Sequence, residues 1–113
     1  ANFKRNFLYI RDAAKAFIHV INNFDKMSGE AYNVGQSEAN ISKLELCQEI
    51  QKQIPDFYFH ESPIGQDPDK RNYIVSNTKI EKTGFKAKVS LAETIAELIK
   101  GLQIVRLRQF KNL

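Results

Sequence analysis

Three side chains in the sequence have the types and the placement to hold a phosphate-bearing ligand. Arg5 comes just before a stretch of β-forming residues, and Arg71 ends a long loop. Asn33 lies beside Gly35 in a second such stretch. Arginine suits a diphosphate because its planar guanidinium donates two parallel hydrogen bonds to phosphate oxygens and stays charged. The same residues also fit an ordinary polar surface, so their spacing alone leaves both interpretations open.

Several kinds of catalytic site are excluded by what the sequence lacks. None of the five glycines occurs in a G-x-G-x-x-G or P-loop spacing, so the chain forms no nucleotide phosphate cradle of those types. There is no Ser, His and acid arrangement and no Tyr-x-x-x-Lys pair. The two histidines stand far apart and Cys47 is alone, which disfavours a metal site and an internal disulfide. We expect no catalytic residue, no metal and no cofactor-binding residue in this chain.

Composition and length indicate one small globular domain. The chain has 113 residues, 42% apolar and 27% charged, with a formal charge of +4, which is close to the average of globular proteins. No apolar run is long enough to span a membrane, and a single cysteine favours a reducing compartment such as the cytoplasm. The start lacks an initiator Met, so we expect a piece of a longer protein.

The hydrophobic pattern predicts short strands interleaved with four helices, an α/β (α+β) fold. The expected helices cover about 12–23, 43–54, a brief stretch from 76 or 77 that ends at Gly84, and 91 to 108 or beyond. The expected strands cover 31–35, 57–60 and 73–75, and residues 7–10 are expected to form a short strand or an extended entry to the first helix. A sheet of such short strands is thin, and we expect it to lean on a larger neighbour.

Local signals place the ends of these helices. Ser42 with Glu45, and Ser90 with Glu93, have the spacing of a capping box, in which each side chain bonds the other residue's backbone amide. Asp12 is a candidate N-cap, with a hydrogen bond expected to the amide of residue 14 or 15.

Other conspicuous side chains are explained more simply by packing or by solvent. Phe7, Tyr9 and Phe17 are able to stack on a base, but their spacing is that of core residues. Cys47 falls on the apolar face of its helix, where inert packing is expected. His60 is expected on the surface.

Five segments, taken in order, add a family resemblance. They are R-N-F-L-Y-I-R-D-A-A (5–14), G-E-A-Y-N-V-G (29–35), S-K-L-E-L (42–46), D-K-R-N-Y-I-V-S (69–76), and K-I with G-F and the closing helix (79–98). This series resembles the signatures of the extended short-chain dehydrogenases, the NAD-dependent sugar epimerases and dehydratases.

The resemblance implies that residues 1–113 are a single C-terminal, substrate-binding lobe of a nucleotide-sugar-modifying enzyme. By analogy, Arg5 and Arg71 hold the substrate diphosphate, and Asn33 lies close to the same nucleotide-diphosphate sugar. The family's glycine-rich loop and Tyr-x-x-x-Lys pair match nothing here. NAD or NADP is therefore expected in the parent enzyme, bound by an N-terminal Rossmann domain that this chain lacks. The chain alone is expected to be inactive, and a homodimeric parent is compatible with the resemblance.

Two other function classes remain as alternatives. A stand-alone nucleic-acid-binding module would use the basic end of the chain, Arg106, Arg108 and Lys111, although cations at a helix C-terminus have a simpler explanation in the helix dipole. A protein-interaction module would dock the apolar face of the last helix on a partner, although the domain's own core requires that face. We expect neither nucleic acid nor a membrane as a partner.

Overall fold

The structure is a computed structural model that describes residues 2–61 and 71–105. In these ranges it has mixed α/β architecture, as predicted, with a two-stranded sheet and five α-helices. The elements are β1 (Lys4–Asn6), α1 (Ile10–Asn22), α2 (Phe24–Met27), the 3-10 turn η1 (Ser37–Ala39), β2 (Asn40–Ser42), α3 (Lys43–Gln53), α4 (Thr78–Glu81) and α5 (Leu91–Ile104).

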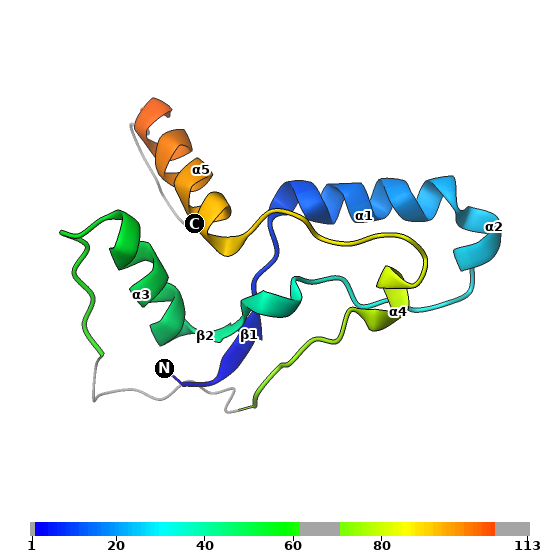
Figure 1. The fold of residues 1–113 in the computed structure, drawn as a ribbon, viewed down its shortest axis with the longest axis horizontal. Helices are drawn as coiled ribbons and strands as arrows, with labels where there is room; N and C mark the ends of the chain where they lie inside the picture. Colours follow the sequence, from blue (N-terminus) through cyan, green and yellow to red (C-terminus); the bar gives the residue numbers. More distant parts are fainter. Residues whose placement is uncertain (1, 62–70, 106–113) are drawn as a thin grey trace, which may run out of the picture.

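The small sheet lies between two groups of helices. Strand β1 pairs antiparallel with β2, with Arg5 opposite Ile41. Helices α3 and α5 lie on one side of it, and α1, α2 and α4 on the other (Figure 1). The sheet therefore lies where the two groups meet, since α3 follows β2 directly and only three residues separate β1 from α1.

Both predicted capping boxes are confirmed. Ser42 Oγ accepts a hydrogen bond from the Glu45 amide at 3.1 Å, and Glu45 Oε2 accepts one from the Ser42 amide at 2.7 Å. Ser90 and Glu93 repeat the pair at 3.2 and 2.8 Å. These reciprocal bonds satisfy amide groups that the first helical turn leaves without partners. Helices α3 and α5 therefore begin where the sequence predicts.

The core lies between α1, α2 and the segment around α4. It contains the buried side chains of Ala16, Met27, Ile80 and Phe85, with Val20, Tyr32 and Val34 packed against them. Tyr9 is buried as predicted. The prediction for Phe17 is wrong, because its side chain is 73% exposed. Only one stripe of α1 faces the core, and Phe17 lies on another.

The predicted strands at 31–35 and 73–75 are wrong. At Val75, and at Gln36 just after the first of these segments, an asparagine side chain makes the backbone hydrogen bonds that a neighbouring strand would make. Asn40 accepts a hydrogen bond from the Val75 amide at 2.9 Å and donates one to the Val75 carbonyl at 3.2 Å. Asn6 does the same for Gln36, accepting at 3.1 Å and donating at 2.7 Å. Each side-chain amide satisfies one donor and one acceptor.

Of the two structures expected for residues 7–10, the extended entry is confirmed for residues 7–9, and the predicted strand at 57–60 is wrong. Residues 7–9 form an extended entry to α1, and the strand lies just before them at Lys4–Asn6. Residues 57–60 belong to no strand.

The predicted helices are largely confirmed, with three corrections. Helix α1 begins at Ile10, so Asp12 is not its N-cap. A short extra helix, α2, occupies part of the predicted loop after α1. Helix α5 ends at Ile104 rather than reaching 108. The basic residues beyond it, and the predicted loop at 62–70, lie outside the described residues.

Helix α1 leaves large apolar side chains in contact with solvent. Ile10, Phe17 and Ile21 are all at least 70% exposed. No described helix is long and apolar enough to cross a membrane.

Candidate functional site

Arg5 and Arg71 come together on the ring of Tyr73. The Cζ atom of Arg5 lies 4.8 Å from the ring centroid, and that of Arg71 lies 5.4 Å from it. Arg5 Nη1 also donates a hydrogen bond to the Arg71 carbonyl at 2.6 Å. We call these three residues the arginine cluster. Two residues 66 positions apart in sequence thus present their guanidinium groups at one place.

Backbone bonds to β1 fix the cluster. The Lys4 amide donates to Asn72 Oδ1 at 2.9 Å, and the Tyr73 amide donates to the Lys4 carbonyl at 3.0 Å. Arg5 Nη1 donates to that same carbonyl at 2.8 Å. The segment from Arg71 to Tyr73 therefore lies along β1, and it continues from there towards α4 (Figure 1).

Asn33 lies apart from this cluster. Its neighbours Tyr32 and Val34 pack against the core, whereas Asn33 is exposed. The contacts found among the described residues do not join Asn33 to either arginine. The structure therefore brings together two of the three predicted site residues and leaves the third on the segment between α2 and η1.

Asn6 is a positioning residue that the sequence analysis missed. Its amide group clasps the backbone of Gln36 and also donates to Asn40 Oδ1 at 3.0 Å. Gly35 makes room for it, because a Cβ atom at that position would lie 2.3 Å from Asn6 Oδ1. An asparagine next to Arg5 and a glycine before Gln36 were the available signals. Asn6 holds the segment that carries Asn33 against the strand that carries Arg5.

Asp12 is a second residue whose role differs from the predicted one. It is 1% exposed, and its Oδ2 accepts hydrogen bonds from the amides of Lys88 and Val89, both at 2.9 Å. Burial raises the pKa of Asp12, but the two amides and Lys15, at 3.5 Å, outweigh burial and hold this pKa below its ordinary value. Asp12 therefore fastens α1 to the segment before α5.

Tyr9 and Glu97 make a further link between α1 and α5. The Tyr9 hydroxyl donates a hydrogen bond to Glu97 Oε2. This bond, together with burial, raises the pKa of Tyr9. Arg11 lies 3.7 Å from the same carboxylate, and its Cζ lies 5.8 Å from the centroid of the Tyr9 ring. Arg11 thus has a carboxylate partner and a ring, which makes it a useful comparison for the arginine cluster.

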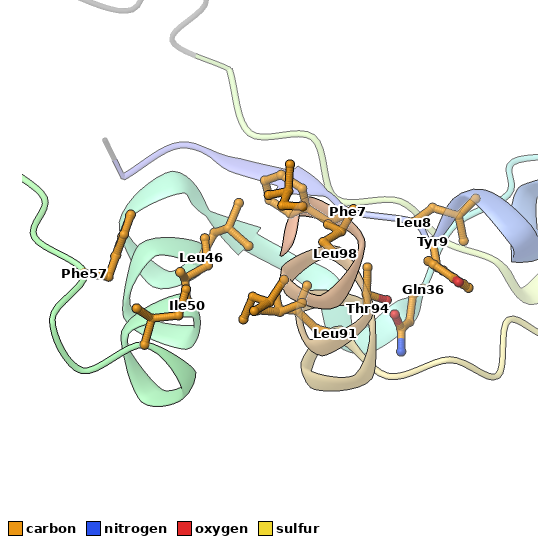
Figure 2. Close-up of a pocket in the computed structure, with 14 residues that line it drawn as sticks. Phe7, Leu8, Tyr9, Gln36, Leu46, Ile50, Phe57, Leu91, Thr94 and Leu98 are labelled. Atoms are coloured by element: carbon orange, nitrogen blue, oxygen red, sulfur yellow. The ribbon is translucent and has the colours of Figure 1, made fainter. Parts of the chain in front are cut away.

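An apolar cavity of about 450 Å³ lies between α3 and α5. Its walls include Leu46 and Ile50 from α3, Leu91 and Leu98 from α5, and Phe7 from the entry to α1 (Figure 2). None of its lining residues is charged, so the cavity does not fit a phosphate. The described residues also contain no group of three or more His, Cys, Asp or Glu side chains able to hold a metal ion.

A second apolar groove, of about 480 Å³, runs along α1. Phe17, Val20 and Ile21 of α1 line it, together with Tyr32 and Val34. We call the exposed residues Ile10, Phe17, Ile18, Ile21 and Phe24 the apolar face. This surface is suited to packing against another apolar surface.

The segment from β1 to Gly35 contains Arg5, Asn6 and all of α1. Residues 1–35 match the model of the NAD dependent epimerase/dehydratase family. This match supports the family that the sequence patterns around Arg5 and Asn33 indicate, and with it an origin of this segment among NAD-dependent enzymes. Arg71 and Tyr73 lie outside the epimerase/dehydratase match.

Proposed function

We propose that this chain is the C-terminal, substrate-binding portion of an extended short-chain dehydrogenase that acts on a nucleotide-diphosphate sugar. Arg5 and Arg71 hold the diphosphate in this proposal, and Asn33 contacts a hydroxyl or phosphate oxygen of the same ligand. The observation that carries the proposal is the convergence of the two guanidinium groups on Tyr73.

The glycines in the part of the chain that the structure describes do not form a cradle for the pyrophosphate of NAD. Among the described glycines, Gly35 has the nearest neighbouring atoms, because the Asn6 amide fills the space where a Cβ atom would lie. Gly35 therefore offers no cradle for a pyrophosphate. Gly29 and Gly84 have positive φ values of 77° and 96° and follow short helices, where they form turns. We therefore assign cofactor binding and the reaction itself to a separate Rossmann portion.

Substrate positioning is the contribution of this portion. Binding energy from a part of the substrate that does not react can hold the reacting sugar in place for hydride transfer. Two arginines match two phosphates, because each guanidinium is able to pair with the oxygens of one phosphate. A ligand with a single phosphate would use only part of the cluster.

The experiment that tests the proposal is an NMR titration of the chain with UDP-glucose, GDP-mannose and glucose 1-phosphate. Two charge-assisted phosphate contacts predict a dissociation constant on the order of a millimolar for the diphosphates. Arg71→Ala should weaken binding roughly 10- to 150-fold, which corresponds to about 1.5–3 kcal/mol. Glucose 1-phosphate should bind more weakly than either diphosphate.

Arg11→Ala is the matched control, since Arg11 also makes a cation–π contact with a tyrosine and lies beside Glu97, outside the arginine cluster. It should leave binding unchanged. Equal losses in Arg11→Ala and Arg71→Ala would point to general charge attraction and contradict the site. NAD should show no binding to the chain, and saturable NAD binding would contradict the assignment of the cofactor to a separate portion.

The apolar face is where we propose that the NAD-binding portion docks. Exposed apolar patches of this kind are typical of interaction surfaces, and Ile10, Phe17 and Ile21 of this face are all at least 70% exposed. Packing against a larger domain would cover Phe17 and Ile21 while leaving the arginine cluster open.

In the protein that carries both portions, Phe17→Glu should separate them. In limited proteolysis, the Phe17→Glu variant should then be cut between the two portions faster than the unchanged protein. Tyr58→Glu alters a side chain outside α1 that is 83% exposed, and this variant should be cut at the original rate. Equal rates for Phe17→Glu and the unchanged protein would contradict docking on this face.

A further inference from the structure

The ring of Tyr73 contacts both guanidinium groups of the arginine cluster, yet Tyr73 contributes little to the core. Its side chain is 41% exposed, and it is absent from the buried cluster around Ile80. Its backbone amide makes the bond to the Lys4 carbonyl, so a substitution at Tyr73 leaves that bond in place. The ring itself is thus a separate feature whose described contacts include both arginines.

We propose that Tyr73 is a positioning residue that presets Arg5 and Arg71 for an anionic ligand with two phosphates. This inference rests on the proposed function of the same two arginines. Long arginine side chains lose rotamer freedom when they bind, and a ring that already contacts the guanidinium group reduces that loss. A cation–π contact uses the face of the ring, and each guanidinium carries five N–H donors for hydrogen bonds to phosphate.

The bond from Arg5 to the Arg71 carbonyl strengthens this arrangement. It fixes the backbone at Arg71 relative to the Arg5 side chain at 2.6 Å, so the ring and the two arginines are held as a unit. Removing the ring should therefore weaken ligand binding, because both arginines lose their arrangement together. The aromatic face carries this role, and the hydroxyl of Tyr73 is not needed for it.

The test is an NMR titration of the 113-residue chain with UDP-glucose in three variants. Tyr73→Phe should bind as the unchanged chain does, whereas Tyr73→Leu should bind about 5- to 30-fold more weakly, as expected for two lost cation–π contacts. Tyr58→Leu is the matched control and should have no effect. The thermal midpoint of Tyr73→Leu should stay within the range of the control.

Two further readouts separate positioning from general structure. The arginine Nε signals of residues 5 and 71 should shift in Tyr73→Leu before any ligand is added, because they lose the ring current. In a variant that already carries Arg5→Ala and Arg71→Ala, adding Tyr73→Leu should cause no further loss of UDP-glucose binding. Equal losses in Tyr73→Phe and Tyr73→Leu would assign the effect to the hydroxyl and overturn the inference.

The outcomes also separate the inference from the proposed function. If the unchanged chain fails to bind UDP-glucose and GDP-mannose, the proposed function fails and the inference falls with it. If the unchanged chain binds and Tyr73→Leu binds equally well, only the inference is overturned.

Discussion

The arginine cluster and the apolar face differ in how the chain itself supports them. Arg5, Arg71 and Tyr73 are fixed by hydrogen bonds to β1 and to one another. Phe17 and Ile21 on α1 are 73% and 70% exposed. Polar bonds within the chain thus arrange the proposed ligand site, whereas the apolar face lacks a covering in the part of the chain that the structure describes.

This difference indicates two separate tasks for one small domain. A site arranged by internal bonds is ready for a ligand before that ligand arrives. An exposed apolar face is suited to a permanent partner, because its burial supplies free energy in proportion to area. Asn6, the last residue of β1, connects the strand of the cluster to the segment before η1, because its side-chain amide bonds the backbone of Gln36.

The largest expected effect comes from breaking that connection. Gly35→Ala would place a Cβ 2.3 Å from Asn6 Oδ1, so the Asn6 amide must leave and the Gln36 backbone loses both bonds. Urea denaturation should show a loss of about 2–4 kcal/mol in the free energy of unfolding.

Gly101→Ala is its control. It lies inside α5 with nothing within 4 Å of an added Cβ, so the same change should stabilise by about 0.5–1 kcal/mol. A loss at Gly101, or no loss at Gly35, would contradict this account of the connection.

The next effect concerns the buried side of α1. Asp12→Ala leaves the amides of Lys88 and Val89 without their acceptor, and should destabilise the chain by about 1–3 kcal/mol in urea denaturation near pH 7.

The same carboxylate predicts a pH dependence. The pKa of Asp12 is lower in the folded state, so its stabilisation is complete above the unfolded pKa of about 4 and is lost as the pH falls through the folded pKa. Stability measured from pH 6 to pH 2 should therefore fall less in Asp12→Ala than in the unchanged chain. Parallel pH profiles of the variant and the unchanged chain would show that Asp12 does not cause the loss of stability at low pH.

A smaller effect is expected on the exposed side of α1. Ile21→Lys should change the free energy of unfolding by no more than about 0.5 kcal/mol, because Ile21 is already largely in water. It should also reduce self-association of the chain in sedimentation velocity, since it places a charge in the apolar face. Val20, one position earlier and packed on the core, is the contrasting site, and Val20→Lys should lower the free energy of unfolding by about 1–3 kcal/mol.

A last variant sharpens the chemistry of the cluster. Arg71→Lys keeps the positive charge but loses the planar fork and the stacking on Tyr73. UDP-glucose binding should weaken less than in Arg71→Ala, by roughly 3- to 10-fold. A lysine variant equal to the unchanged chain would show that charge alone is sufficient.

Sequence reasoning predicted the features that depend on neighbouring residues. The capping boxes at Ser42 and Ser90 were correct because both partners lie within four positions. The strands failed because their outcome depended on distant amides, as when Asn40 bonds Val75. The prediction of Asp12 as an N-cap was wrong for the same reason, since its hydrogen-bond partners are 76 and 77 residues away.

The candidate site was predicted in part. Arg5 and Arg71 were named from their chemistry and from the family resemblance, and the structure brings them together. Their contact through Tyr73 had no signal in sequence spacing, because it depends on how residues 71–73 lie along β1. The diphosphate role of the arginines stays a prediction until ligand binding is measured.

One measurement tests the central claim most directly: the arginine Nε signals of the chain followed by NMR during titration with UDP-glucose. The account predicts that the signals of Arg5 and Arg71 shift together with one dissociation constant, while that of Arg11 stays in place. Shifts confined to Arg11, or none at Arg5 and Arg71 at saturating ligand, would contradict the assignment of this cluster to the diphosphate.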